Sequence, residues 1–271
     1  MSFNLPLKLL LTGLIIFTST SFAFSQKVET GFLNRNLTFN KKNYRYQVYL
    51  PYQYTRNKKW PVILFLHGRD ERGEDGLLQT DVGIATAIRR YMERFPVIVV
   101  FPQCPSDSHW TQPFMGKQAL IALDKTIQEF NGDQQRIYLT GISMGGAGSW
   151  YLAANNPARF AAIAPICGWV VPPVNLASLP KLPEAVSKIM QEKDSYTAMA
   201  KLIGKTPVWL FHGDMDDIVA VNESQKMAEA LKAIDTEIKY TEYNGVGHNS
   251  WDQAYAESDF ITWLLSHSLS K

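Results

Sequence analysis

Short apolar runs alternate with helical patterns along most of the chain. The runs are mostly continuous, as in strands that are buried on both faces. They cover residues 62–66, 97–101, 137–140, 161–166, 208–211 and 238–243. Between most of them apolar residues recur at helical spacing, for example at Leu120, Leu123 and Ile127. This alternation predicts an α/β fold with a mainly parallel sheet and helices on both faces.

Residues 33–54 follow a different pattern. Tyr44, Tyr46 and Val48 alternate with Arg45 and Gln47, which gives a period of two. This period predicts an antiparallel hairpin at the edge of the sheet, within residues 26–54. We expect one α/β domain that spans residues 26–271 and begins with this hairpin.

Residues 170–205 lie between two predicted core strands and are too long for a simple connection. A proline-rich stretch comes first, and an amphipathic stretch follows over residues 184–203. Two interpretations fit this pattern. The segment is either a small cap over the carboxyl edge of the sheet or a crossover helix with an irregular start.

Residues 1–25 have the composition of a signal peptide. Lys8 is the only early charge, residues 9–17 are apolar, and small residues precede a possible cleavage site after Ala23 or Ser25. An uncleaved membrane anchor is the alternative. We therefore expect a secreted or periplasmic protein with no membrane association once the leader is removed.

The charge distribution argues against a nucleic-acid partner, and the positions of the cysteines argue against a disulfide bond. The formal net charge of the 271 residues is +2, and the basic residues are spread along the chain, so no nucleic-acid partner is expected. Cys104 and Cys167 each follow a predicted parallel strand. In the usual strand order of such a sheet these strands are separated by two others, at about 4.8 Å per strand. We therefore expect two free thiols.

The segment from Ile137 to Gly146 carries the strongest chemical signal. An apolar strand runs directly into Gly141-Ile142-Ser143-Met144-Gly145, and a helix is expected over residues 147–155. A turn tight enough to expose a serine hydroxyl leaves no room for neighbouring Cβ atoms, so it requires glycines. This pattern predicts a nucleophile elbow with Ser143 as the nucleophile. An ordinary serine in a glycine-rich turn is the alternative.

An activated serine needs a histidine base and a carboxylate that orients it. His248 is the preferred base because Gly245 and Gly247 place it in a flexible turn after the last predicted strand. The acid follows the strand that ends at His212, where Asp216 is preferred over its rivals Asp217 and Asp214. We expect His67 and His212 to be structural, and His109 and His267 to be solvated.

Acyl transfer also needs two hydrogen-bond donors for the oxyanion. The main-chain N–H groups of Met144 and Arg69 are the candidates, because they follow the serine and an earlier strand. Residues 70–76 carry a dense run of charges. The preferred interpretation of this run is a solvated loop. The alternative is that Arg69 or Arg72 contacts an acidic or polar group of the substrate.

Five segments together resemble the α/β-hydrolase superfamily of serine hydrolases. They are Phe65-Leu66-His67-Gly68, Phe101-Pro102-Gln103-Cys104-Pro105 with Trp110, Gly141 to Gly146, His212-Gly213-Asp214-Met215-Asp216 and Gly247-His248-Asn249-Ser250-Trp251. Within the superfamily, the chain is similar to the predicted peptidases, a phospholipase/carboxylesterase-like group related to feruloyl esterases and polyhydroxybutyrate depolymerases. The similarity covers nearly all of residues 55–265.

This resemblance implies a triad of Ser143, His248 and Asp216, main-chain donors at Arg69 and Met144, and a site lined by Trp110. Relatives often carry a small residue and a glycine after the first His-Gly, where this chain has Arg69 and Asp70. The substrate is therefore less firmly indicated than the chemistry.

The sequence thus predicts a secreted serine hydrolase that cleaves carboxylic esters through an acyl-enzyme, a reaction that requires no metal or cofactor. The expected substrate is a small-molecule or polymer-derived ester. The candidates, in order of preference, are an aryl or acetyl ester of plant polysaccharide, a short polyester and a peptide. Trp110 and Trp169 near strand ends favour a flat or sugar-like ligand. The alternatives are a serine peptidase acting on short peptides, a transferase, and a non-catalytic binding protein with the same fold.

Overall fold

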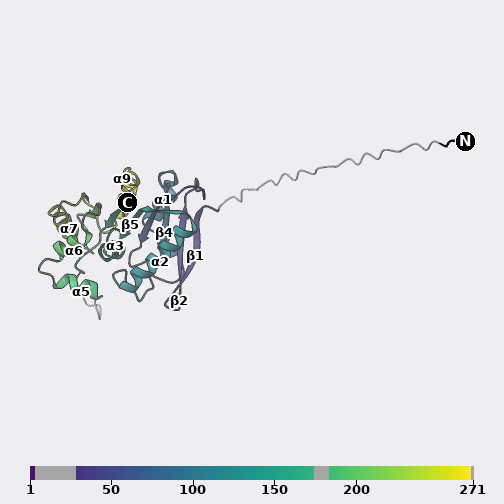
Figure 1. Cartoon of the computed structure of the whole chain (residues 1–271). Helices are drawn as coiled ribbons and strands as arrows, with labels where there is room; N and C mark the ends of the chain where they lie inside the picture. Colours follow the sequence, from purple (N-terminus) through teal and green to yellow (C-terminus); the bar gives the residue numbers. More distant parts are fainter. Residues whose placement is uncertain (4–28, 174–182, 270–271) are drawn as a thin grey trace.

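A single eight-stranded sheet runs through the molecule (Figure 1), in the order β1-β2-β4-β3-β5-β6-β7-β8. The pairs β1–β2 and β2–β4 are antiparallel, and all other neighbours are parallel. The strands are β1 (Gly31–Phe39), β2 (Lys42–Leu50), β3 (Trp60–Leu66), β4 (Ile98–Pro102), β5 (Gly132–Ile142), β6 (Ala162–Ile166), β7 (Val208–Gly213) and β8 (Ile238–Tyr243). The predicted mainly parallel sheet is confirmed, and β1 and β2 form the predicted edge hairpin.

The computed structural model describes residues 1–3, 29–173 and 183–269. Most of the predicted signal peptide at residues 1–25 therefore lies outside the described residues. Within the described ranges, no helix combines the length and the apolar character needed to cross a membrane.

Helices cover both faces of the sheet and form two separate apolar cores. On one face pack α2 (Pro113–Glu129), α3 (Met144–Ala154), α5 (Glu184–Gln191), α6 (Ser195–Ile203) and α7 (Asn222–Lys232). On the other face pack α1 (Ile84–Arg90), α8 (Trp251–Ala256) and α9 (Phe260–Leu265). The central strands contribute to both cores, which explains their continuous apolar sequences.

The described part of the segment between β6 and β7 has the packing of a crossover. The helix α6 contacts α3, α5 and α7, and Figure 1 shows α5, α6 and α7 together at the end of the molecule opposite β1 and β2. Asp194 begins α6 by accepting hydrogen bonds from the N–H groups of Tyr196 and Thr197. The crossover interpretation therefore fits these helices, and residues 174–182 of the expected cap lie outside the described residues.

Cys104 and Cys167 are both buried and unbonded. They follow β4 and β6, which are separated by β3 and β5 in the sheet. Burial raises the pKa of the Cys167 thiol far above its ordinary value, and the Asp216 carboxylate nearby adds to this effect. Both cysteines are therefore neutral thiols, which are poor nucleophiles.

Candidate active site

The carboxyl edge of the parallel strands collects the candidate catalytic side chains. Ser143 follows β5, Asp216 follows β7 and His248 follows β8. Parallel strands direct their carboxyl ends to the same edge of a sheet, so residues far apart in the sequence meet there.

The turn around Ser143 has the geometry of a nucleophile elbow. Ser143 has a φ of 53°, in the left-handed region, and immediately precedes α3. Its N–H donates to the carbonyl of Ile166 on β6 at 2.9 Å, which fixes the turn against the neighbouring strand. A Cβ at Gly141 would lie 2.4 Å from the oxygen of Gly145, and one at Gly146 would lie 2.5 Å from the oxygen of Ile166. The glycines are therefore required by the backbone contacts of the turn.

Three side chains form a continuous hydrogen-bonded chain. His248 Nε2 lies 2.9 Å from Ser143 Oγ, and His248 Nδ1 lies 2.7 Å from Asp216 Oδ2. A carboxylate can only accept, so Nδ1 carries the proton and Nε2 is left to accept the proton of the serine hydroxyl. The structure thus brings together the three residues that the sequence predicts as a triad, in the geometry of a nucleophile, a base and an orienting acid.

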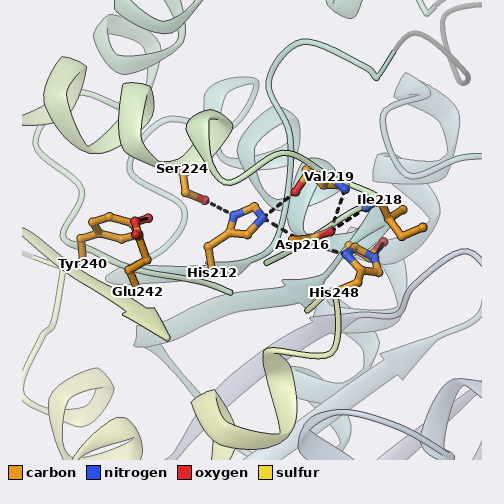
Figure 2. Close-up of polar contacts among 9 residues, drawn as sticks. His212, Asp216, Ile218, Val219, Ser224, Tyr240, Glu242 and His248 are labelled. Atoms are coloured by element: carbon orange, nitrogen blue, oxygen red, sulfur yellow. Dashed lines mark hydrogen bonds and ion pairs between the residues drawn. The ribbon is translucent and has the colours of Figure 1, made fainter. Parts of the chain in front are cut away.

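Asp216 is held by donors on both of its oxygens. Oδ1 accepts from the N–H groups of Ile218 and Val219 at 2.9 and 2.8 Å, while Oδ2 accepts from His248 and from His212 at 3.1 Å (Figure 2). Burial raises the pKa of this carboxyl, but the hydrogen bonds from His212, His248 and Val219 outweigh that effect and leave the pKa well below its ordinary value. Asp216 is therefore ionised at neutral pH.

The two rival acids have other positions. Asp214 Oδ1 accepts a hydrogen bond from the N–H of Gly245 at 2.7 Å, which ties the acid loop to the loop that carries His248. Asp217 is exposed to solvent. Of the three acids, only Asp216 reaches His248 in this arrangement.

The two predicted oxyanion donors border the same cavity as Ser143. Arg69 and Met144 both line it. Among the backbone hydrogen bonds that close the described loops, none uses the N–H of Arg69 or of Met144. Both N–H groups are therefore available to an oxygen bound beside the serine.

Arg72 braces the loop that carries Arg69. Its Nε donates to the carbonyl of Arg69 at 2.9 Å, and its Nη1 donates to the carbonyl of Ser108 at 3.3 Å. The buried Gln103 holds the same loop further on by accepting a hydrogen bond from the N–H of Gly76 at 2.7 Å. The charged run is thus a braced loop, and the Arg72 guanidinium is occupied by main-chain carbonyls.

The cavity at Ser143 has a volume of about 190 Å³. Its walls combine apolar and polar side chains from the sheet edge and the neighbouring loops. They come from Gly68, Arg69, Asp70, Glu71, His109, Ile142, Ser143, Met144, Trp169, Ile218, Val219, His248 and Trp251. Trp169 lies in this wall, where the sequence predicts a substrate contact.

Trp110 does not line the cavity, and the prediction that it contacts substrate is corrected. Its side chain is 2% exposed, and its indole N–H donates to the carbonyl of His67 at 3.0 Å. A Cβ at Gly148 would lie 2.4 Å from the Cβ of Trp110, which shows how closely α3 approaches it. Trp110 is instead a packing residue beneath the loop that follows β3.

Two cavity residues were missed or misread from the sequence. His109 is half-buried and packs against Trp169, with ring centroids 5.6 Å apart, whereas a solvated side chain was expected. Burial, with a smaller effect of the Arg72 charge, lowers the pKa of His109 to about 4. Glu71, in the charged run, also lines the cavity, and burial raises the pKa of its carboxyl. His109 follows β4 and Glu71 follows β3, so both lie at the carboxyl edge of the sheet. This position could have identified them as cavity residues from the sequence.

A second cavity of about 410 Å³ adjoins the first between α1 and α8. Glu71 and Trp251 border both cavities. The polar side chains of the second cavity include Asp81, Thr86, Arg90, Asn249 and Asp252. Glu71 and Trp251 thus form a common wall between the cavity at Ser143 and a second cavity whose lining is both polar and apolar.

One group of side chains has atoms that a metal ion prefers. The ligand atoms of Cys167, Asp216 and His248 lie within 4.8 Å of one another. Asp216 and His248 are already hydrogen-bonded to each other, and the Cys167 thiol is neutral. A metal bound there would replace the contact that orients His248, so the donor set fits the triad better than a metal centre.

The sequence comparisons agree with this geometry. A model of the esterase family, described as "Putative esterase", matches residues 38–265. Acyl-protein thioesterase 1 of Neurospora crassa is 21% identical over 237 residues, which cover 75% of this chain and 86% of that protein. A protein of Arthroderma benhamiae described as an uncharacterized secreted protein is 26% identical over 76% of this chain, which spans only 23% of that protein.

Two solved structures show the same fold. A thermostable esterase superposes with a TM-score of 0.72 at 29% identity, covering 88% of this chain and 63% of that one. A ferulic acid esterase superposes with a TM-score of 0.66 at 18% identity, covering 86% of this chain and 98% of that one. These similarities place the eight-stranded sheet among the α/β-hydrolases.

Proposed function

The chain belongs to the esterase family, and we propose that it is a serine hydrolase that cleaves carboxylic esters through an acyl-enzyme. One observation carries the proposal, namely the unbroken hydrogen-bonded chain from Ser143 through His248 to Asp216 on a strained elbow. Roles for these residues follow from what each atom can accept or donate.

In the first step Ser143 Oγ attacks the ester carbonyl carbon while its proton passes to His248 Nε2. The N–H groups of Arg69 and Met144 stabilise the oxyanion. The carbon–oxygen bond to the alcohol then breaks, and His248 gives its proton to the leaving alkoxide. Water attacks the resulting acyl-enzyme, again losing a proton to His248, and Ser143 leaves with that proton. Asp216 stays ionised and stabilises the imidazolium in both steps.

The two adjoining cavities suggest how an ester would be oriented. The apolar side chains Ile142, Met144 and Trp169 suit a small or flat acyl group beside Ser143. The polar side chains of the cavity between α1 and α8, which include Asp81, Arg90 and Asp252, suit an alcohol with several hydroxyl groups. These features favour aryl or acetyl esters of a sugar as the substrates.

We also propose that the protein acts outside the cytoplasm. The composition of residues 1–25 supports export, and the Arthroderma benhamiae relative is described as secreted. N-terminal sequencing of the exported protein tests this proposal, with cleavage expected after Ala23 or Ser25. Full-length protein found only in the cytoplasmic fraction, with its leader intact, would contradict it.

Hydrolysis of a panel of p-nitrophenyl esters and methyl ferulate tests the function. The wild-type protein is compared with Ser143→Ala and His248→Ala. Activity that depends on the acyl group and is lost in both variants would support the proposal. A folded wild-type protein that cleaves no ester but cleaves short peptides would replace it with a peptidase.

A further inference from the structure

His212 lies behind the triad, on the far side of Asp216 from His248. It belongs to β7, and its ring is fully buried. His212 Nε2 lies 3.1 Å from Asp216 Oδ2 and 2.9 Å from the carbonyl oxygen of Val219, while Nδ1 lies 2.6 Å from Ser224 Oγ (Figure 2). The triad therefore continues through His212 to Ser224 on α7.

The partners of the ring fix the position of its proton. A carboxylate and a backbone carbonyl can only accept hydrogen bonds, so Nε2 must be protonated. The Ser224 hydroxyl can donate to Nδ1, which satisfies the ring in its neutral form. In this tautomer the Nε2–H of His212 is shared between the carbonyl oxygen of Val219 at 2.9 Å and Asp216 Oδ2 at 3.1 Å.

We propose that His212 is a positioning residue that acts through Asp216, holding Oδ2 in place for His248 and setting how strongly His248 binds its proton. The proposal rests on the hydrolase function proposed above. Two main-chain N–H groups hold Oδ1, whereas His212 and His248 share Oδ2. Loss of the His212 donor would therefore leave His248 as the side-chain donor to Oδ2.

The expected electrostatic effect has a definite sign. A hydrogen bond from His212 draws negative charge on Asp216 away from His248. Without it, Asp216 would stabilise the His248 imidazolium more strongly, and a higher pH would be needed to deprotonate the base. The acid limb of the pH–activity profile would therefore move to higher pH.

Charged and titratable groups face this chain from two sides. Arg69, Asp70, Glu71 and His109 share the cavity wall with His248, where burial raises the pKa of the Glu71 carboxyl and lowers that of His109 to about 4. Glu242 on β8 lies near His212, and hydrogen bonds from Tyr240 and Gln225 keep its pKa below the ordinary value. Glu242 is therefore ionised across the neutral range and does not titrate with His248. Cys167 near Asp216 is a neutral thiol over the same range.

Two substitutions at His212 separate positioning from packing. The amide nitrogen of glutamine can occupy the position of Nε2, whereas that of asparagine reaches only the position of Nδ1. We expect His212→Asn to lower kcat on the order of 10- to 100-fold with little change in KM, the size expected for a lost hydrogen bond to a charged group. We expect His212→Gln to restore most of kcat and the wild-type pH profile.

Ser224→Ala is the matched control on the far side of the ring. It removes the partner of Nδ1 and leaves the Nε2 donor in place, so kcat should fall less than in His212→Asn. Thermal unfolding of each variant is measured in parallel. Equal activity and equal pH profiles in wild type, His212→Asn and His212→Gln would overturn the positioning role while leaving the hydrolase function intact.

A measurement on the wild-type protein does not depend on the variants folding. Nitrogen-15 NMR of the histidine rings reports which nitrogen of His212 carries the proton. Protonation at Nε2 across the neutral range supports the proposal, and protonation at Nδ1 alone overturns it. A wild-type protein that neither cleaves esters nor reacts with a fluorophosphonate at Ser143 would instead overturn the hydrolase function, and the positioning role with it.

Discussion

The backbone of Gly145 packs directly against the carbonyl of Leu66. A Cβ placed on Gly145 would lie 1.9 Å from the oxygen of Leu66 and 2.7 Å from that of His67. The first turn of α3 is therefore pressed against the end of β3, where the loop carrying Arg69 begins. Arg69 and Met144 accordingly both line the cavity at Ser143.

Gly145→Ala should consequently prevent the elbow from forming. Neither backbone partner can move away without shifting β3, so we expect a loss of unfolding free energy of about 4 kcal/mol or more, or failure to fold. Urea unfolding followed by circular dichroism measures this. Gly247→Ala is the control, because its nearest contact would be at 3.8 Å. Equal stability of the two variants would contradict the tight packing.

Asp216→Asn should reduce kcat by roughly 10³- to 10⁴-fold, because an amide can orient His248 in the wrong tautomer and cannot stabilise its charge. Asp217→Asn, on an exposed neighbour, should stay within about 2-fold of wild type. Steady-state hydrolysis of a p-nitrophenyl ester compares the two variants. A larger effect at Asp217 would show that Asp217, and not Asp216, orients His248.

Glu71 should make the site discriminate against anionic esters. Its half-buried carboxyl borders the cavity at Ser143, where a negative substrate would be repelled. We expect Glu71→Gln to raise kcat/KM for p-nitrophenyl hemisuccinate, relative to neutral p-nitrophenyl butyrate, by about 3- to 10-fold.

Asp70→Asn is the control for this experiment. The Asp70 side chain also borders the cavity but is 86% exposed, so solvent screens its charge. The ratio of the two ester activities should change by less than about 2-fold. An unchanged ratio in Glu71→Gln would show that its carboxyl does not face the substrate.

His67 should make the protein less stable in mild acid. Its ring is buried between the carbonyl of Gly68 and the N–H of Cys104, and burial lowers its pKa from 6.5 to about 4. Between these pH values the unfolded chain binds a proton that the folded chain does not, so the free energy of unfolding falls as the pH falls. The full contribution is about 3 kcal/mol.

Urea unfolding at several pH values between 7 and 4.5 measures this loss. His67→Asn removes the titrating ring, so its stability should depend less steeply on pH than that of the wild type over the same window. Parallel stability curves for the two proteins would show that His67 does not cause the acid sensitivity.

The sequence was sufficient to predict the features that depend on residues close together in the chain. Apolar runs identified β3 to β8, and the glycines around Ser143 identified the strand, turn and helix of the elbow. These features depend on backbone sterics and on burial of whole segments, which residues a few positions apart determine. The edge hairpin was predictable for the same reason.

Only the tertiary structure decided which distant side chains meet. Asp216, Asp217 and Asp214 are equivalent as residue types in one loop, and the contact with His248 across 32 positions separates them. The inward packing of Trp110, the position of Glu71 and the approach of His212 to Asp216 likewise depend on segments brought together by the sheet. The sequence by itself therefore determined the fold class and the nucleophile, because local backbone geometry encodes them. The position of Asp216 after its strand favoured it as the orienting acid, but its contact with His248 and the walls of the cavity were decided by long-range packing.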